Sequence, residues 1–401
     1  MKTNVALFVE TPSPPVSRAN LRLYQLGLNL VNSDYRVFLV VPSFYPHRRK
    51  NLVYSGISIQ QYPGLAVFLY SGIRFFVRSF HLLLTILYTT LLNKKVGLKV
   101  VHGWNPLAGL AAVLSSKIIG CPAFIDFTDF YSDIAKTDSP FMTPLFRSVE
   151  RYILSSAERI MVVSNIMKAT LVRYYGISSD KIYVVPDGTN ANMFNPNVDG
   201  ARIRRLHGLR NKFVLIYHGD IKSPDGVDVL LHALAIVVKK YPNIKLMILG
   251  GGGKYFDGLI SLVKKLELDS YVIFTGWVPH NEVPKYIAAS DVGMMPLRAT
   301  LNHNCYVSFK LFEYWGIGKP VVVSRVAAIS EIVKDGINGV LVNPGNKVDL
   351  AGGILSILKD PEKAKAMGKK GRKLVEEKYN WQNLMDNEQQ IYNQYNFNRS
   401  P

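Results

Sequence analysis

Cysteine is scarce in this sequence. Its 401 residues include two cysteines, Cys121 and Cys305, which lie far apart. They form neither a metal-binding spacing nor the disulfide framework of a small secreted scaffold. We therefore expect the protein to reside in a reducing compartment. With 48% hydrophobic and 19% charged residues, the chain can form a hydrophobic core large enough to stabilise the fold without disulfides.

Acidic residues are missing from a long interval near the N-terminus. Residues 35–125 contain no Asp or Glu but ten Lys or Arg, and residues 1–210 carry a net +13 against +6 for residues 211–401. A basic surface with Phe and Leu beside it suits docking on an anionic bilayer. The alternative is a core helix with a solvated basic edge. Nucleic acid could also attract this charge, but the sequence contains no motif that recognises it.

Long apolar runs are missing too. Within residues 65–92, Arg74, Arg78 and His81 interrupt the apolar residues, leaving a stretch of about 11 where a spanning helix needs about 20. The apolar run of residues 5–9 is too short for a signal-peptide core and predicts a buried strand. We expect a cytoplasmic protein, peripheral on the cytoplasmic face of the membrane.

Glycine is absent from the first predicted turn, residues 10–20, which reads ETPSPPVSRAN. A dinucleotide-binding oxidoreductase would need a G-x-G-x-x-G turn there, so this class is disfavoured. Ser17 and Arg18 are instead candidates to contact an acceptor or a phosphate. The alternative for Ser17 is an ordinary helix N-cap.

Short apolar strands alternate with helical patterns along the chain, which predicts an α/β protein with parallel sheets. The rhythm breaks at residues 195–212, a polar stretch with Pro and Gly, and then restarts. This pattern predicts two doubly wound, Rossmann-like domains, residues 1–208 and 209–380, followed by a C-terminal helix over residues 381–401. The expected strands are residues 4–9, 35–41, 99–104, 122–127, 159–164, 182–186, 212–220, 244–250, 271–277, 291–297, 320–324 and 339–344.

Residues 308–324, SFKLFEYWGIGKPVVVS, are the most informative segment. They predict a short helix, a glycine-rich turn and a buried strand. Lys310 and Glu313 are three residues apart and share a helix face. A cation and a carboxylate in this position suit a ligand with both a phosphate and a diol, such as a nucleotide sugar. The alternative is an ordinary ion pair on a helix surface.

This segment resembles the nucleotide-binding signature of the group 1, or family 4, retaining glycosyltransferases, and the flanking segments match as well. The resemblance implies a GT-B fold, in which two Rossmann-like domains face a cleft and a C-terminal helix crosses back to the first domain. It also implies a nucleotide sugar in the second domain and an acceptor in the basic first domain. The residues that match the signature in register are Lys310, Glu313, Tyr314, Gly318, Lys319, Pro320 and Ser324.

Donor-binding residues follow from the resemblance and from the chemistry of a diphosphate. Glu313 would accept hydrogen bonds from two ribose hydroxyls, and Lys310 would contact phosphate or sugar. Glycines after a strand let backbone amides approach a phosphate without a metal. The full expected set is Gly219, Lys222, Gly250, Gly251, Gly252, Val278, Lys310 and Glu313.

Other positions depart from the family pattern. Cys305 stands where many members have a first glutamate, and Asp220 and Asp225 stand where a loop often carries Arg and Lys. Two aspartates there would weaken diphosphate binding, so we expect Asp225→Lys to tighten it. In the first domain Thr128 stands where His is frequent.

The first domain nevertheless keeps several family positions. The resemblance implies catalytic roles for His102, Asp129 and Lys310, and places Asn105 and Thr128 on the acceptor side. For His102 a purely structural role is equally open, because it lies at a strand end.

These observations predict a retaining, metal-independent glycosyltransferase. It would move a sugar from a UDP- or GDP-linked donor, with no other cofactor, to a membrane-associated lipid, lipid-linked glycan or polysaccharide. A catalytically silent sugar-nucleotide-binding or membrane-surface scaffold of the same fold stays open because of Asp220, Asp225, Cys305 and Thr128.

Overall fold

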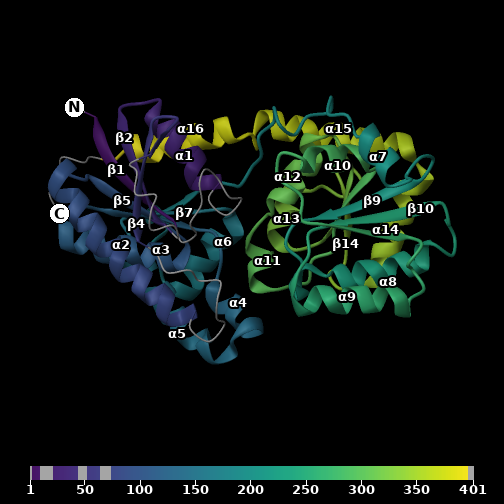
Figure 1. Cartoon of the computed structure of the whole chain (residues 1–401), viewed down its shortest axis with the longest axis horizontal. Coiled ribbons are helices and arrows are strands. Elements are labelled where there is room, and N and C mark those ends of the chain that lie inside the picture. Colours follow the sequence, from purple (N-terminus) through teal and green to yellow (C-terminus); the bar gives the residue numbers. More distant parts are fainter. Residues whose placement is uncertain (1, 10–20, 44–51, 64–73, 396–401) are drawn as a thin grey trace. The chain divides into compact units, whose positions relative to one another are not determined.

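The computed structural model of the chain describes residues 2–9, 21–43, 52–63 and 74–395 (Figure 1). The chain forms two compact units. Unit 1 comprises Met1–Pro186 and Leu384–Pro401, and unit 2 comprises Asp187–Asn383. Within the described part, no helix combines the length and apolar character needed to cross a bilayer.

The described part of unit 1 contains an eight-stranded sheet in the order β3-β4-β2-β1-β5-β6-β7-β8, parallel except for the β3–β4 pair. This order is that of a doubly wound α/β domain. The strands are β1 (Thr3–Phe8), β2 (Tyr35–Ser43), β3 (Leu52–Tyr54), β4 (Ile57–Pro63), β5 (Val100–Trp104), β6 (Ala123–Phe127), β7 (Arg159–Val162) and β8 (Ile182–Val184).

Helices cover the sheet of unit 1. α2, α3 and α5 pack side by side, whereas α1 lies with α16 (Figure 1). The helices are α1 (Leu21–Val31), α2 (Arg74–Val96), α3 (Asn105–Ile119), α4 (Tyr131–Asp138), α5 (Thr143–Ser156), α6 (Asn165–Thr170) and α16 (Trp381–Asn393), with short turns η2 (Pro140–Met142), η3 (Leu171–Tyr175) and η4 (Ser179–Lys181).

The C-terminal helix returns to unit 1, as the resemblance to GT-B glycosyltransferases implies. From α16, Gln389 accepts a hydrogen bond from Asn29 at 3.0 Å, and Asn393 accepts one from the Tyr35 hydroxyl at 2.8 Å. Tyr392, on the same helix, is fully buried and packs edge-on against Phe124 of β6. This segment therefore completes the core of unit 1.

Unit 2 contains a six-stranded parallel sheet in the order β11-β10-β9-β12-β13-β14. Its strands are almost continuous apolar runs because both faces of the sheet are covered. They are β9 (Phe213–His218), β10 (Ile244–Leu249), β11 (Val272–Gly276), β12 (Val292–Met295), β13 (Val321–Ser324) and β14 (Val340–Val342).

The helices of unit 2 form two layers. α8, α9 and α14 lie on one side of the sheet, and α12 packs with α15 on the other (Figure 1). The helices are α7 (Ala201–Leu206), α8 (Val227–Val237), α9 (Gly253–Lys265), α10 (Val283–Ala289), α11 (Leu301–Cys305), α12 (Phe309–Gly316), α13 (Ala327–Ile332), α14 (Lys347–Lys359) and α15 (Pro361–Glu377), with the turn η5 (Ser223–Asp225).

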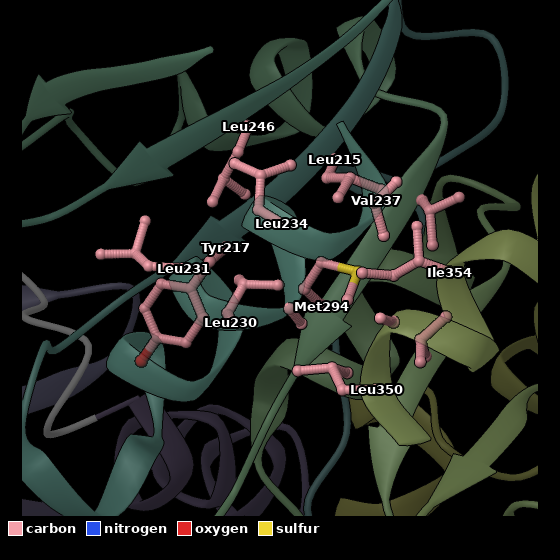
Figure 2. Packing of buried hydrophobic residues seen from close by; sticks show 14 of the residues in the cluster. Leu215, Tyr217, Leu230, Leu231, Leu234, Val237, Leu246, Met294, Leu350 and Ile354 are labelled. Atoms are coloured by element: carbon pink, nitrogen blue, oxygen red, sulfur yellow. The ribbon is translucent and has the colours of Figure 1, made fainter. Parts of the chain in front are cut away.

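One core cluster fills the space between this sheet and helices α8 and α14. Leu230, Leu234 and Ile354 meet Leu215 and Met294 there (Figure 2). Tyr217 lies at the edge of the cluster, and its hydroxyl points away from most of the labelled leucines. Since Tyr217 is the residue before the end of β9, its buried ring links the core to the carboxyl end of the sheet.

The unit boundaries differ from the predicted domain boundaries. Unit 2 begins at Asp187, so residues 195–212 belong to it rather than forming a linker. This stretch contains α7, where Arg204 Nη2 donates to both carboxylate oxygens of Asp291 at 2.7 and 2.8 Å. Arg204 and Asp291 are 87 positions apart in the chain. The polar, linker-like composition of residues 195–212 gave no indication that the two side chains would pair. The second boundary falls within α16, after Asn383.

Candidate functional site: a buried lysine and a histidine-flanked carboxylate

Helix α12 carries the two residues expected to bind the donor. The Ser308 side chain accepts a hydrogen bond from the Lys310 backbone N–H and starts the helix. Both Lys310 and Glu313 are buried, and each has its own partners, so they do not form the surface ion pair that was the alternative. Burying a charged group costs free energy unless the group is paired. Two buried and partnered charged side chains on one helix face therefore make this face a candidate functional site.

Lys310 is held by β9 and by the loop that follows it. Its Nζ donates to the Tyr217 hydroxyl at 3.0 Å and lies 4.7 Å from the centre of that ring. The Asp225 Oδ1 lies 3.7 Å from the same Nζ. The Tyr217 hydroxyl in turn donates to the Asp220 carbonyl at 2.6 Å. The lysine is thus fixed at the carboxyl end of β9, where parallel α/β sheets bind ligands.

The loop after β9 contains the two aspartates that replace the family's cations. Asp225 is buried, and its Oδ2 accepts a hydrogen bond from the Lys222 backbone N–H at 3.0 Å. Asp225 therefore shapes the turn and partly neutralises Lys310, rather than facing a ligand from the loop surface. Asp220 is exposed, 3.6 Å from the Lys222 ammonium. The expectation that Asp225→Lys would tighten binding is corrected on this ground.

The predicted glycines lie at the ends of β9 and β10. Gly219 and Gly250 have φ of +114° and +125°, and a Cβ at Gly250 would lie 2.1 Å from the Gly219 carbonyl oxygen. Gly251 lies near the Phe256 ring, whereas the Cβ position of Gly252 has no atom within 4 Å. Since α9 begins directly after this run, backbone N–H groups at its start are suited to a phosphate.

Two histidines flank the Glu313 carboxylate. His218, the last residue of β9, places its Nε2 3.3 Å from Glu313 Oε2. His280, from the loop after β11, places its Nε2 3.1 Å from Oε1. Val278, predicted as a donor contact, lies two residues before His280 and is half-buried. Neither histidine was predicted from the sequence. The available signal was that His218 lies near the end of the predicted strand 212–220 and that His280 comes shortly after the predicted strand 271–277.

Lys319, the second lysine of the signature, has a different role from Lys310. Its Nζ donates to the Ala288 and Ser290 carbonyls at 3.0 and 2.6 Å, at the end of α10. Burial lowers its pKa, and nearby Asp291 opposes this shift. Cations stabilise helix C-termini. This lysine therefore holds α10 to the sheet.

In unit 1 the structure brings three predicted residues together at the carboxyl ends of β5 and β6. Asn105, with φ of +59°, accepts hydrogen bonds from the Thr128 N–H and hydroxyl at 3.1 and 2.8 Å. Its Nδ2 donates to Asp129 Oδ2 at 3.2 Å, and the Thr128 hydroxyl lies at the same distance from that oxygen. Ser17 and Arg18 lie outside the described residues.

His102 does not belong to this cluster. It is fully buried in β5, and its Nδ1 lies 2.5 Å from the Tyr392 hydroxyl of α16. Burial, with Arg22 nearby, lowers its pKa to about 3. This placement favours the structural alternative over a catalytic role, because a buried neutral imidazole tied to α16 does not reach a substrate.

Among the described residues, His102 belongs to one group of side chains of metal-ligand type, with Asp126 and Glu388. The Arg22 guanidinium lies 2.6 Å from Asp126 Oδ2 and 3.5 Å from Glu388 Oε2. Burial raises the pKa of Asp126, and Arg22 counteracts it. The Arg22 guanidinium already supplies the positive charge beside the Asp126 and Glu388 carboxylates. These contacts link α1 to β6 and α16, which indicates a structural role for the group.

Comparison with known proteins identifies the class. Residues 19–193 match the family described as Glycosyltransferase Family 4, and residues 201–374 match the one described as Glycosyl transferases group 1. The two matches follow each other in chain order and cover nearly all of the sequence. The chain belongs to the family 4, or group 1, glycosyltransferases.

Curated relatives are similar over part of their length. A GDP-mannose-dependent alpha-(1-6)-phosphatidylinositol monomannoside mannosyltransferase of Mycolicibacterium smegmatis is 30% identical over 245 residues, 60% of this chain and 63% of the relative. A D-inositol 3-phosphate glycosyltransferase of Segniliparus rotundus is 27% identical over 286 residues, 70% of this chain and 58% of the relative. The chain thus aligns with about six tenths of the length of each relative.

Solved structures show the same fold. The sucrose-phosphate synthase of Thermosynechococcus elongatus superposes with a TM-score of 0.84 at 21% identity, covering 98% of this chain and 99% of that one. The lipopolysaccharide-biosynthesis glycosyltransferase WaaG gives 0.72 at 16% identity, covering 98% and 100%. The GT-B fold predicted from the sequence is thereby confirmed.

Proposed function

We propose that this protein is a retaining, metal-independent glycosyltransferase that takes its sugar from a UDP- or GDP-linked donor bound in unit 2. The observation that carries the proposal is the buried face of α12. Glu313 offers a carboxylate for a ribose diol, and Lys310 offers a cation for a phosphate, both beside the glycine loops of β9 and β10. A phosphate together with a ribose diol is characteristic of nucleotides, and the glycosyltransferase family of the chain favours a nucleotide sugar among them.

Departure of the nucleoside diphosphate is the step these groups would assist. Backbone amides near Gly250–Gly253 and the Lys310 ammonium would stabilise the charge that develops on the leaving phosphate. The sugar would react on one face through an oxocarbenium-like state, and the leaving phosphate would take the acceptor's proton. A protein base at Thr128 is then unnecessary, and no metal ion is required for charge neutralisation.

We place the acceptor in unit 1, at the carboxyl ends of β5 and β6, beside the partly exposed Asp129 and its buried partners Asn105 and Thr128. The proposed acceptor is a membrane-associated lipid, lipid-linked glycan or growing polysaccharide. One curated relative is named for a phosphatidylinositol mannoside substrate, which supports a lipid acceptor here. The half-buried Asp129 carboxylate, fixed by Asn105 and Thr128, is suited to a sugar hydroxyl.

Helix α2 supports peripheral docking on an anionic membrane at its cytoplasmic face. Phe80, Leu83, Leu87 and Leu91 recur every three or four residues and are 44–65% exposed, so they form one apolar stripe. The helix ends in Lys94 and Lys95, within the interval that contains no acidic residue. Apolar side chains would insert between lipids, and lysines would contact anionic headgroups.

A thermal-shift screen tests the donor assignment. UDP, GDP, ADP and inorganic pyrophosphate are compared, each with wild-type protein and with Glu313→Gln. A ligand at 100 times its Kd adds about 2.7 kcal/mol to the free energy of unfolding. We expect UDP or GDP to stabilise the wild type far more than the variant. Equal stabilisation of the two proteins by every nucleotide would refute the ribose assignment.

A catalytically silent binder of the same fold is the second candidate. It is favoured by Cys305, which is buried at a position where the family often has a glutamate. Sugar transfer would exclude it, whereas nucleotide binding alone would not.

A further inference from the structure

The Glu313 carboxylate is enclosed by two histidine side chains. Its two oxygens are each approached by an imidazole, from two loops that are far apart in the sequence. The Glu313 side chain is only 3% exposed. Each carboxylate oxygen can accept a second hydrogen bond, but the two imidazoles help to close the space around the carboxylate. A ribose diol gains room beside both oxygens when one of the imidazoles moves aside.

The two histidines differ in how firmly the structure holds them. His218 is 1% exposed, ends the central strand β9 in register with Leu249 of β10, and packs edge-on against the Tyr314 ring at 4.9 Å. Its ring is enclosed, so it cannot turn away without displacing neighbours such as Tyr314. It is therefore suited to orient the carboxylate whether or not a ligand is bound.

His280 is held less firmly. Its side chain is 31% exposed, and its ring rests on Phe194 at 5.5 Å. It lies between β11 and α10, in a loop where the neighbouring Trp277 is 65% exposed. A rotamer change would move its ring into solvent without breaking a strand pairing or opening the core.

We propose that His280 is a placeholder for the donor's ribose. In the structure its Nε2 contacts Glu313 Oε1 as a ribose hydroxyl would, and it gives way when a ribonucleoside diphosphate binds. His218 is the positioning residue that keeps the carboxylate aimed at the diol. This inference rests on the proposed role of Glu313 and adds that the two histidines act in opposite directions on affinity.

Calorimetric titration separates the two roles. UDP and GDP are titrated into wild type, His280→Ala, His280→Ser, and His218→Asn, with inorganic pyrophosphate as the ribose-free ligand. Removing the competing contact should tighten nucleoside diphosphate binding about 3- to 10-fold in both His280 variants, the range of one net hydrogen bond. His218→Asn should weaken it by a similar factor. The affinity for pyrophosphate should be the same in the His280 and His218 variants as in the wild type.

Three controls sharpen the test. His232→Ala, on α8 and outside the site, should leave every affinity unchanged. In a Glu313→Gln background the gain from His280→Ala should vanish, because the placeholder no longer competes for a carboxylate. With 2′-deoxy-UDP the gain should shrink, since one hydroxyl of the diol is missing.

Unchanged or weaker UDP and GDP binding in both His280 variants would overturn the placeholder role. If Glu313→Gln still weakened wild-type binding, the donor assignment would survive that result and only this inference would fail. If Glu313→Gln had no effect on nucleotide binding, the donor assignment itself would be refuted. A gain that extended equally to pyrophosphate would also overturn the inference, because it would not depend on the ribose.

Discussion

At the scale of single residues, the signature motif predicted Lys310 and Glu313, and the structure places both in a buried cluster. It could not predict their partners. Glu313 meets residues 33 and 95 positions earlier in the chain, His280 and His218, because three strands end at the same edge of the sheet. Tyr217 was missed for a related reason, since a tyrosine in an apolar strand predicts core packing, which it also provides.

Glu313→Gln tests the carboxylate itself. The amide keeps the shape but removes the charge and one acceptor, so we expect a loss of about 1.5–3 kcal/mol in transition-state binding, from charge-assisted hydrogen bonds. The measurement is kcat/KM for the donor, with circular dichroism to confirm folding. A value within twofold of the parent would show that Glu313 does not hold the ribose.

Asp225→Lys tests the corrected role of the loop aspartate. The substitution removes the acceptor for the Lys222 N–H and brings a second ammonium close to Lys310. We expect a loss of about 1–3 kcal/mol in the free energy of unfolding, measured by urea denaturation. Asp220→Lys is the matched control: this exposed position should keep its stability. Equal stability of both variants would contradict the buried role of Asp225.

At the scale of elements, continuous apolar runs predicted the parallel strands of both sheets except β4, because strands covered on both faces are apolar throughout. The hairpin β3–β4 was missed. Its strands are short or polar, and its turn depends on positive φ at Ser55 and Gly56, +48° and +83°, where the Ser-Gly pair was the available signal. Helix α7 was hidden by the polar composition of residues 195–212.

The α2 stripe yields a test of membrane docking. Leu83→Glu with Leu87→Glu should abolish the salt-insensitive part of binding to anionic liposomes, whereas Lys94→Glu with Lys95→Glu should remove the salt-sensitive part, about 1 kcal/mol for each lysine. Val348→Glu, similarly exposed but in unit 2, is the control. If wild-type protein ignores anionic liposomes at low salt, the stripe has another partner.

Lys319→Met tests the link between the signature turn and α10. The methionine keeps the apolar stem, but the Ala288 and Ser290 carbonyls lose their donor. We expect a loss of about 1–3 kcal/mol in stability, measured by thermal or urea unfolding, with little change in nucleotide affinity. Lys359→Met, exposed on α14, should be neutral. A large loss of affinity with normal stability would instead place Lys319 in the donor site.

At the scale of the whole molecule, the sequence predicted two α/β units and a C-terminal segment returning to the first. What it could not give was the position of the boundaries, because these depend on long-range contacts such as Arg204–Asp291. It likewise left His102 open between two roles, and the full burial of His102 with its contact to Tyr392 favours the structural one. The interval without acidic residues, residues 35–125, lies wholly within unit 1, where we propose the acceptor and membrane functions.

Transfer of a sugar from donor to acceptor distinguishes a glycosyltransferase from a protein that binds nucleotides without catalysis. Purified protein is incubated with a panel of UDP- and GDP-sugars and a membrane-lipid extract, with and without excess EDTA, and products are followed by mass spectrometry. We expect one donor to transfer its sugar to an acceptor, equally well in EDTA, and Glu313→Gln to be much slower. Nucleotide binding without transfer for any donor, or activity that EDTA abolishes and Mg²⁺ restores, would contradict it.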